Sequence, residues 1–357
     1  MSGWGWAEIS SEALLHNLRH VRRLVGSANV SAVVKSDAYG HGLENVAGIL
    51  SGHVDAFAVA TCEEGTQVRR IDAATPIWVF LGFADATELE ACSSHRLIPV
   101  VSNYHQIELL YETHLPLTSV ILELDIGMGR LGFDFSNTHQ MLREFQSRTG
   151  IRADLILGHL PSAEGGNDSE VRGQFNRFLE EANVLGGELT LANSAAIMAY
   201  PYSHLDWVRP GLMLYGVSPF SDCRGDDSGL RPAMRVFSRI RGTRMMRSGQ
   251  AIGYGSRFRC KEDTRVGLLG FGYADGFPRQ EISSGSVTVG GHRCPILGRI
   301  SMDSMIVDLS KVPSAQAGDV VELWGQGVSA EEVASHAGLI PHQLLTHLGP
   351  RVDRVLS

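Results

Sequence analysis

The sequence predicts an N-terminal (β/α)8 barrel of the TIM type over residues 1–230, followed by a mainly β domain over residues 231–357. Three observations support this α/β prediction. Eight short apolar runs alternate with amphipathic stretches up to about residue 216. The runs are apolar on both faces, as in a parallel sheet that is covered on both sides. After residue 230 the pattern changes to closely spaced alternating segments with glycine-rich turns, which is typical of antiparallel strands.

The elements of the barrel follow one another at short intervals along the chain. The predicted strands cover residues 31–36, 56–61, 77–83, 98–102, 120–125, 155–160, 188–193 and 205–209. The helical patterns cover residues 43–52, 62–72, 85–92, 104–114, 138–149 and 173–185. An earlier strand and helix occupy residues 5–25, where either Ser10 or Ser11 is a suitable helix cap.

The β domain begins after a loop-like stretch rich in Asp, Gly, Ser and Pro at residues 218–232. Its predicted strands lie within residues 237–245, 265–272, 286–291, 304–309 and 319–325. A last helix over residues 329–339 begins with a capping pair, Ser329 and Glu332.

Composition excludes several classes of protein. The 357 residues are 43% hydrophobic and 20% charged, which is ordinary for a globular chain and excludes disorder. A net charge of −8 argues against nucleic acid or an anionic membrane as the main partner. The five cysteines form no Cys-x-x-Cys pair, so we expect neither a metal site nor a disulfide framework. With no signal peptide and no run of 18 apolar residues, we expect a soluble, cytoplasmic protein.

Lysine is rare in this chain. Of 31 basic residues only three are lysines, and the first of them, Lys35, lies in the apolar run SAVVKSD. One interpretation is a strand-end lysine whose ammonium reaches water. The other is an amine that performs chemistry for which a guanidinium is unsuited.

Polar residues follow several of the predicted strands, at the barrel face where catalytic groups gather. They are Lys35, Arg130, His159, Ser194 and Arg209. The loops after the seventh and eighth strands, a usual phosphate site in such barrels, offer the Ser194 hydroxyl and the backbone of Gly211 and Leu212, and Tyr39 could add a phenol. A reactive lysine opposite an anchored phosphate is the arrangement that pyridoxal 5′-phosphate requires.

One motif permits a different interpretation. GMGRLG at residues 127–132 matches the G-x-G-x-x-G pattern of dinucleotide sites. FDFSNTHQ follows it instead of an apolar helix start. We therefore expect these glycines to let the backbone turn and present Arg130.

Taken together, the motifs resemble those of alanine racemases, the fold-type III pyridoxal phosphate enzymes. The resemblance begins at VVKSDAYGHG and covers nearly the whole chain. It continues in order through GMGRLGF, ANSAA, VRPGLMLYG, GYGSRF, GYADGFPR, GRISMD and AGDVVELWG. It implies interconversion of L- and D-alanine by two-base proton transfer on a pyridoxal phosphate aldimine.

The resemblance also implies a role for each matching residue. Lys35 would carry the cofactor and serve as base for the D-enantiomer, and Tyr254 of the other subunit would be the base for the L-enantiomer, so the site needs a homodimer. Arg209 would donate to the pyridine nitrogen, and His159 would lie beneath the ring. The cofactor phosphate would be held by Tyr39, Ser194, Gly211 and Leu212. The substrate carboxylate would be bound by Arg130 and by the Met302 backbone of the other subunit. The surrounding shell and access channel would include Glu123, Glu164, Tyr273, Arg279, Arg299 and Asp303.

These implied roles agree with physical chemistry. Racemisation needs bases on opposite faces of a planar carbanion, and one lysine cannot reach both. A phenol with a pKa near ~10 is a poor base unless cationic or donating groups stabilise its phenolate. An arginine partner keeps its proton, so the ring is a weaker electron sink and side reactions are limited.

The chain departs from the family pattern at two positions. Many members have a carbamylated lysine seven residues before the arginine of GMGR, where this chain has Glu123. We expect its carboxylate to brace Arg130 without carbamylation. Many members also have a phosphate-binding tyrosine where this chain has Pro350, which has no donor. We therefore expect weaker cofactor retention or broader substrate tolerance.

Other functions remain open at this point. The leading hypothesis is an alanine racemase that supplies D-alanine for peptidoglycan. A racemase of serine or another small amino acid is the nearest alternative, and basic amino acid decarboxylases share the fold. A non-catalytic pyridoxal phosphate-binding protein would lack the β domain and Tyr254.

Overall fold

The chain forms two compact units in the computed structural model, which describes residues 5–115, 117, 119–134, 145–148, 150–151, 153–279 and 285–357. The barrel unit comprises residues 14–38 and 42–214, and the sheet unit comprises residues 1–13, 39–41 and 215–357. This division differs from the boundary expected near residue 230. The first strand and residues 215–230 lie with the sheet unit.

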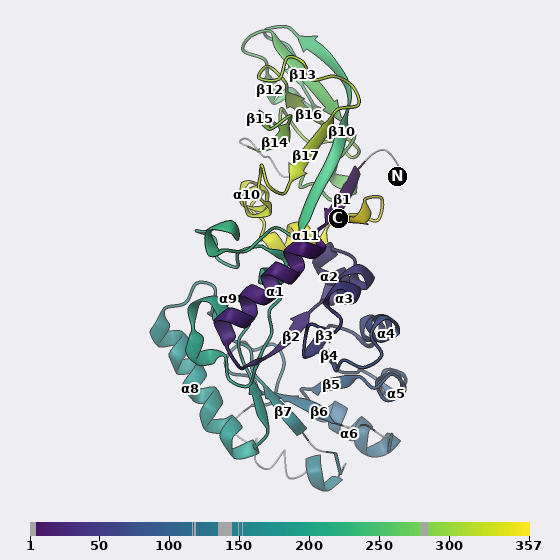
Figure 1. Ribbon diagram of the computed structural model, residues 1–357, viewed down its shortest axis with the longest axis vertical. Helices are drawn as coiled ribbons and strands as arrows, with labels where there is room; N and C mark the ends of the chain where they lie inside the picture. The colour runs from purple at the N-terminus through teal and green to yellow at the C-terminus, as the bar shows by residue number, and fades with distance from the viewer. Residues whose placement is uncertain are drawn as a thin grey trace. The chain divides into compact units, whose positions relative to one another are not determined.

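Eight parallel strands close the barrel, which confirms the predicted fold class (Figure 1). They are β2 (Asn29–Val33), β3 (Ala56–Val59), β4 (Ile77–Val79), β5 (Ile98–Val101), β6 (Val120–Glu123), β7 (Ala153–Leu157), β8 (Glu188–Thr190) and β9 (Trp207–Val208). Pairing of Asn29 with Trp207 joins the last strand to the first. Each strand ends before its apolar run does, because the last residues of the run leave the ladder at the carboxyl end of the barrel.

Helices alternate with these strands, as the amphipathic patterns predict. They are α1 (Ser11–Val25), α3 (Leu43–Leu50), α4 (Cys62–Ile71), α5 (Ala86–Ser94), α6 (Tyr104–Thr113), α8 (Asp168–Leu185) and α9 (Ser194–Ala199). Side chains of Thr61, Asp85, Asn103 and Asn167 accept backbone N–H bonds at four helix starts. The Ser10 hydroxyl accepts from Ala13 N at the start of α1. The helix predicted over residues 138–149 lies largely outside the described residues.

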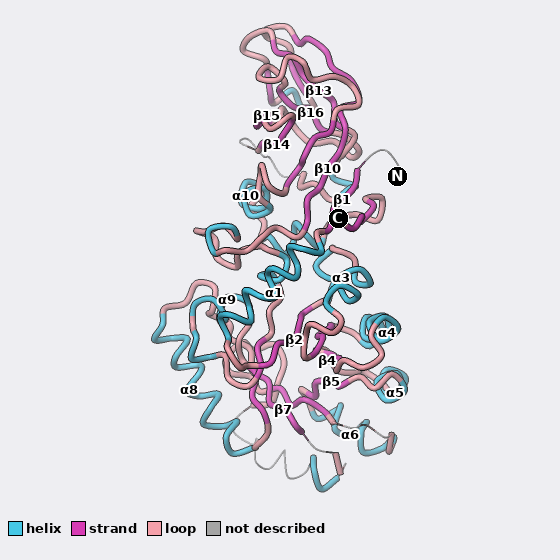
Figure 2. Tube along the Cα trace, in the orientation of Figure 1, coloured by secondary structure: helices cyan, strands magenta, loops and turns pink. Residues whose placement is uncertain are grey.

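The sheet unit is built on the long strand β10 (Met234–Met246), drawn in magenta in Figure 2. The sheet runs in the order β15-β14-β17-β10-β1-β18, while β13 pairs with β10 and β16 pairs with β13. The strands are β1 (Gly5–Ile9), β13 (Thr264–Leu269), β14 (Ser286–Val289), β15 (His292–Pro295), β16 (Met305–Asp308), β17 (Val320–Trp324) and β18 (Asp353–Leu356), and the helices are α10 (Ala330–His336) and α11 (Pro341–Thr346). Strand β1 pairs antiparallel with β10, which is why the first residues of the chain belong to this unit.

Within the part of the chain that the structure describes, no helix combines the length and the apolar character needed to cross a membrane.

Candidate active site

Lys35 lies two residues after the end of β2 and opens a left-handed turn, labelled α2 (Lys35–Gly40). Four consecutive residues from Ser36 to Tyr39 have φ between 52° and 56°, although none of them is glycine. Such backbone costs about 1–2 kcal/mol for each L-residue. Strained backbone persists where the surroundings hold it and is concentrated at functional sites.

Two carboxylates of the barrel unit hold this turn. Glu64 of α4 accepts from Ser36 N at 2.6 Å and from Ala60 N at 2.8 Å. Asp37 accepts from Leu43 N at 2.7 Å. The residue next to Lys35 is therefore fixed by an anion on the neighbouring helix.

The Lys35 amine lies among cations. Burial, then the positive charge of Arg130, lowers the pKa of Lys35, and Arg209 adds to this while Glu64 opposes it. The Phe80 ring centroid is 5.7 Å from the amine nitrogen. A buried amine with a lowered pKa is more often neutral, and a neutral amine is both a nucleophile and a base.

His159 and Arg130 complete the convergence predicted at the barrel face. Burial, together with the positive charges of Arg209, Arg130 and Lys35, lowers the pKa of His159 to about 3. The imidazole is therefore neutral near pH 7. His159, Arg130 and Glu123 line one small pocket at the end of β6 and β7.

Arg209 is only 4% exposed, and neutral acceptors bind its guanidinium. Its two terminal nitrogens donate to Thr190 Oγ1 at 2.7 Å and to the carbonyls of Gly158 at 2.7 Å and Leu191 at 3.2 Å. Burial lowers the pKa of Arg209 to about 10, opposed by Glu123, so the group stays charged near pH 7.

Glu123, the last residue of β6, is buried near both arginines. Burial raises the pKa of its carboxyl to about 7, while Arg209 and Arg130 oppose that rise. Near neutral pH this group is therefore divided between the anionic and the neutral form.

Backbone donors and a hydroxyl gather after β8 and β9. The buried Ser194 hydroxyl, at the start of α9, accepts from Gly211 N at 3.0 Å and from Met213 N at 3.3 Å. Leu212 is buried between these two residues. Amide N–H groups and a hydroxyl at one place are the donor set that binds a phosphate. Tyr39 belongs to the sheet unit, where its ring stacks on Tyr215 with centroids 4.8 Å apart.

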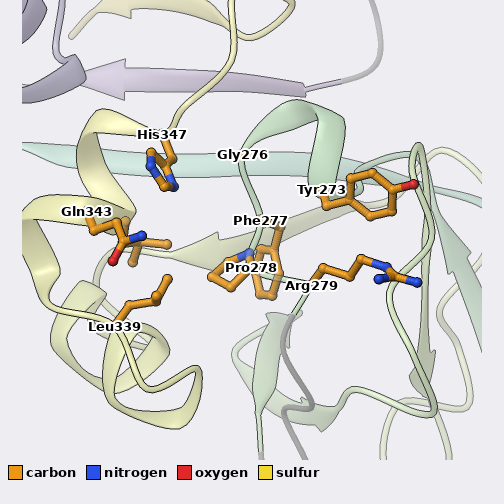
Figure 3. Close-up of a pocket in the computed structure, with 9 residues that line it drawn as sticks. Tyr273, Gly276, Phe277, Pro278, Arg279, Leu339, Gln343 and His347 are labelled. Atoms are coloured by element: carbon orange, nitrogen blue, oxygen red, sulfur yellow. The ribbon is translucent and has the colours of Figure 1, made fainter.

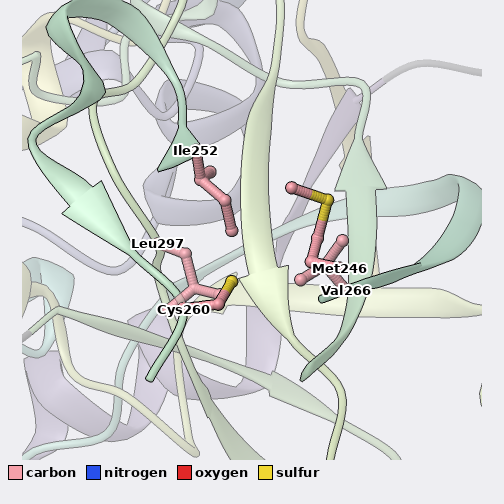
Figure 4. Packing of buried hydrophobic residues seen from close by; sticks show 5 residues of the cluster. All are labelled: Met246, Ile252, Cys260, Val266 and Leu297. Atoms are coloured by element: carbon pink, nitrogen blue, oxygen red, sulfur yellow. The ribbon is translucent and has the colours of Figure 1, made fainter. Parts of the chain in front are cut away.

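Tyr254 lies in the sheet unit at the tip of a hairpin between β11 (Ala251–Ile252) and β12 (Phe258–Arg259). The tyrosine is 66% exposed, and glycines with φ of 73° precede and follow it. The base of the hairpin is buried in an apolar cluster of Met246, Ile252, Cys260, Val266 and Leu297 (Figure 4). The phenol is thus presented outward on an anchored loop.

Met302 and Tyr273 are neighbours in the same unit. The Met302 carbonyl accepts from Ala274 N at 2.9 Å, and Tyr273 N donates to Ser301 O at 3.1 Å. A Cβ at Gly272 would lie 2.3 Å from the Met302 carbonyl oxygen, so this approach requires glycine. The Met302 and Tyr273 side chains are 53% and 37% exposed.

The remaining predicted channel residues are more dispersed. Arg279 places its guanidinium 5.5 Å from the Tyr273 ring centroid, and both line a pocket of about 240 Å³ with residues of α11 (Figure 3). Asp303 accepts from Arg351 at 2.9 Å, and Arg299 is half-buried. Glu164 is exposed on the barrel unit.

Three residues of the site had not been singled out from the sequence. Glu64 holds the turn after Lys35, Phe80 packs against its amine, and Thr190 anchors Arg209. Thr190 and Phe80 fall within predicted strands. The apolar residues around them predicted the strands, and nothing in the sequence marked these two as site residues.

Family models match both units. The N-terminal domain of alanine racemase matches residues 9–219, and the C-terminal domain of alanine racemase matches residues 233–356. The chain is 40% identical to an alanine racemase of Nitrosococcus oceani, over 98% of this chain and 99% of that protein.

Solved structures agree with these matches. The biosynthetic alanine racemase from Pseudomonas aeruginosa has a TM-score of 0.95 at 37% identity, covering 99% of both chains. An alanine racemase from Bartonella henselae with covalently bound pyridoxal phosphate has a TM-score of 0.89 at 30% identity, covering 99% of this chain and all of that one. The chain therefore belongs to the alanine racemase family.

Proposed function

We propose that this protein is a pyridoxal phosphate-dependent alanine racemase that interconverts L- and D-alanine. The observation that carries the proposal is the Lys35 amine, which is desolvated beside two arginines at the end of a barrel strand. We further propose that it acts in the cytoplasm and supplies D-alanine for peptidoglycan.

The donors present fit the cofactor. Lys35 supplies the amine to which pyridoxal phosphate attaches, and Ser194 with the Gly211 and Leu212 backbone supplies phosphate donors, with Tyr39 as a further donor. Pyridoxal phosphate, when bound, withdraws electrons from the substrate Cα and so acidifies its proton.

The protein moves the proton with two groups. The Lys35 amine nitrogen removes or returns it on one face of the Cα, and the Tyr254 hydroxyl of a second subunit does so on the other. Arg130 and the Met302 backbone N–H of the second subunit bind the substrate carboxylate and hold the Cα between the two bases. The exposure of Tyr254 and Met302 supports a homodimer in which a second copy covers them.

Arg209 limits side reactions in this scheme. Its guanidinium is held by two carbonyls and a hydroxyl, and toward the pyridine nitrogen it would act as a donor that keeps its proton. His159, neutral because of burial, would lie beneath the ring and orient Arg209.

Glu123 is proposed to steer Arg130. Its carboxyl shares a pocket with Arg130, whose positive charge favours the carboxylate form of Glu123. We propose no carbamylated lysine at this place, since Lys35 is the only lysine of the barrel unit. The predicted channel residues Glu164, Tyr273, Arg279, Arg299 and Asp303 stay in that role.

A coupled assay tests the proposal directly. Purified protein with pyridoxal phosphate is given L-alanine, and D-alanine is detected with D-amino acid oxidase. L-serine and larger L-amino acids are tested in parallel, because Pro350 predicts a more tolerant site. Formation of D-serine without D-alanine would show that serine, and not alanine, is the substrate. If no amino acid gave a D-product, racemase activity would be contradicted.

A further inference from the structure

Two cysteines of the barrel unit that the proposed reaction does not use lie together. Cys62 Sγ and Cys92 Sγ are 3.1 Å apart, and both side chains are buried, at 5% and 0% exposed. Cys62 is the first residue of α4, and Cys92 lies in the next helix, α5. A disulfide has its sulfurs about 2.05 Å apart, so closure needs an approach of about 1 Å.

The two thiols are chemically distinct. Cys62 and Cys92 share a hydrogen bond for which either thiol is a suitable donor, and this contact lowers the pKa of Cys62 against the opposing effect of burial. The same hydrogen bond, together with burial, raises the pKa of Cys92. The position of Cys62 at a helix N-terminus also favours its thiolate. Cys62 is therefore the nucleophile of the pair, and Cys92 is the resolving thiol.

We propose that Cys62 and Cys92 are a modification site that a small peroxide oxidises reversibly to a disulfide. The Cys62 thiolate attacks one peroxide oxygen, the O–O bond breaks, and Cys62 becomes a sulfenic acid while the other oxygen leaves as hydroxide. Cys92 sulfur then attacks Cys62 sulfur, and its proton leaves with the sulfenic oxygen as water. In sum, two thiols and one hydrogen peroxide give one disulfide and two waters.

The disulfide would act on Lys35 through the first turn of α4. Glu64 lies two residues after Cys62 and binds Ser36 N, the amide next to Lys35. Thr66 Oγ1 donates to the Cys62 carbonyl at 2.9 Å and makes this turn stiff. A shift of about 1 Å at Cys62 therefore changes how Glu64 holds the strained turn. The proposal that the disulfide forms does not depend on the proposed function. The proposal that the disulfide changes turnover does rest on that function.

Thiol counting by mass tests the modification. Full-length protein, as purified with its cofactor, is treated with hydrogen peroxide, unfolded, alkylated and weighed intact. All five cysteines are free at the start, so oxidation should leave three alkylated thiols and a peptide linking Cys62 to Cys92. Cys62→Ser and Cys92→Ser should each abolish the link. Cys223→Ser is the matched control, because Cys223 is more exposed and has the hydroxyls of Ser218 and Ser228 as its contacts.

Five alkylated thiols after peroxide, or a linked peptide that persists in Cys92→Ser, would overturn the pairing. In the activity arm, turnover of the oxidised protein should fall about 10- to 100-fold, since a 1 Å misplacement can cost about 100-fold, and dithiothreitol should restore it. A disulfide with unchanged turnover would refute the coupling through Glu64. An inactive reduced protein that still forms the disulfide would refute the proposed function and leave the modification standing.

Discussion

The two units present their chemical groups in opposite ways. In the barrel unit Arg209 is 4% exposed, and burial shifts the pKa of Lys35, His159 and Glu123. In the sheet unit Tyr254 is 66% exposed and Met302 is 53% exposed. The barrel groups are tuned by their own chain. The sheet groups are exposed, and in the proposed homodimer a second copy of the chain would supply their surroundings.

Replacing Lys35 tests the barrel side of this comparison and should have the largest effect. Lys35→Ala removes the cofactor amine and one of the two bases, so we expect racemisation to fall by about 10⁴-fold or more. The absorbance of the protein-bound cofactor should be lost with it, as a visible spectrum will show. Lys261→Ala changes an exposed lysine of the sheet unit and should leave both readouts unchanged. Racemisation that survives in Lys35→Ala would remove this amine from the mechanism.

Replacing Tyr254 tests the sheet side. Tyr254→Phe keeps the ring and removes the acid–base group, so racemisation should fall about 10²–10⁴-fold. Lys35 still reaches the proton of D-alanine, so exchange of that proton with deuterated water, measured by NMR, should persist for D-alanine and be lost for L-alanine. Tyr104→Phe, at a tyrosine 54% exposed in the barrel unit, is the control. Equal loss of exchange for both enantiomers would indicate a structural role.

Replacing Glu123 sharpens the claim that burial tunes the barrel groups. Its folded-state pKa of about 7 is above the ordinary 4.5, so the native state binds the extra proton between these values. Its contribution to stability is therefore present at low pH and is lost as the pH rises through about 7. Glu123→Gln stays neutral, so the free energy of unfolding of the variant relative to wild type should rise by about 2.5 kcal/mol between pH 5 and pH 8.

Urea unfolding of both proteins at the two pH values measures this difference. The pKa of His159 is lowered to about 3, so this residue makes the folded protein more stable as the pH rises. His159 is present in both proteins, so its contribution cancels in the difference. A difference that is the same at both pH values would show that Glu123 is ionised throughout.

Sequence periodicity predicted the barrel well because each strand is apolar on both faces and carries its own signal. All eight strands and most helices appear where they were expected. The sequence predicted a strand near residue 5 but not the unit that it joins, since Gly5–Ile9 pairs with residues more than 220 positions later. Pairing over such a distance depends on the whole fold and leaves no local pattern.

The site shows the same limit. Lys35 and Arg209 stand out because a charge in an apolar run is unusual. The left-handed turn from Ser36 to Tyr39 contains no glycine, so the sequence does not predict its positive φ angles. The contact between Cys62 and Cys92 joins two helices, and their spacing of 30 residues has no periodic meaning. These features arise from tertiary contacts that override local propensity.

Mixing two inactive variants decides whether the exposed groups of the sheet unit serve a second copy. When Lys35→Ala and Tyr254→Phe proteins are co-expressed with different tags, a heterodimer has one site with both bases and one with neither. Random pairing makes half of the dimers mixed, so activity should return to about a quarter of wild type, and tag-purified heterodimer should reach about half. If Lys35 and Tyr254 of the same chain formed the site, every site in every dimer would lack one base, and mixing would restore nothing. Recovery of activity therefore distinguishes a site shared between two subunits from a site formed within one chain.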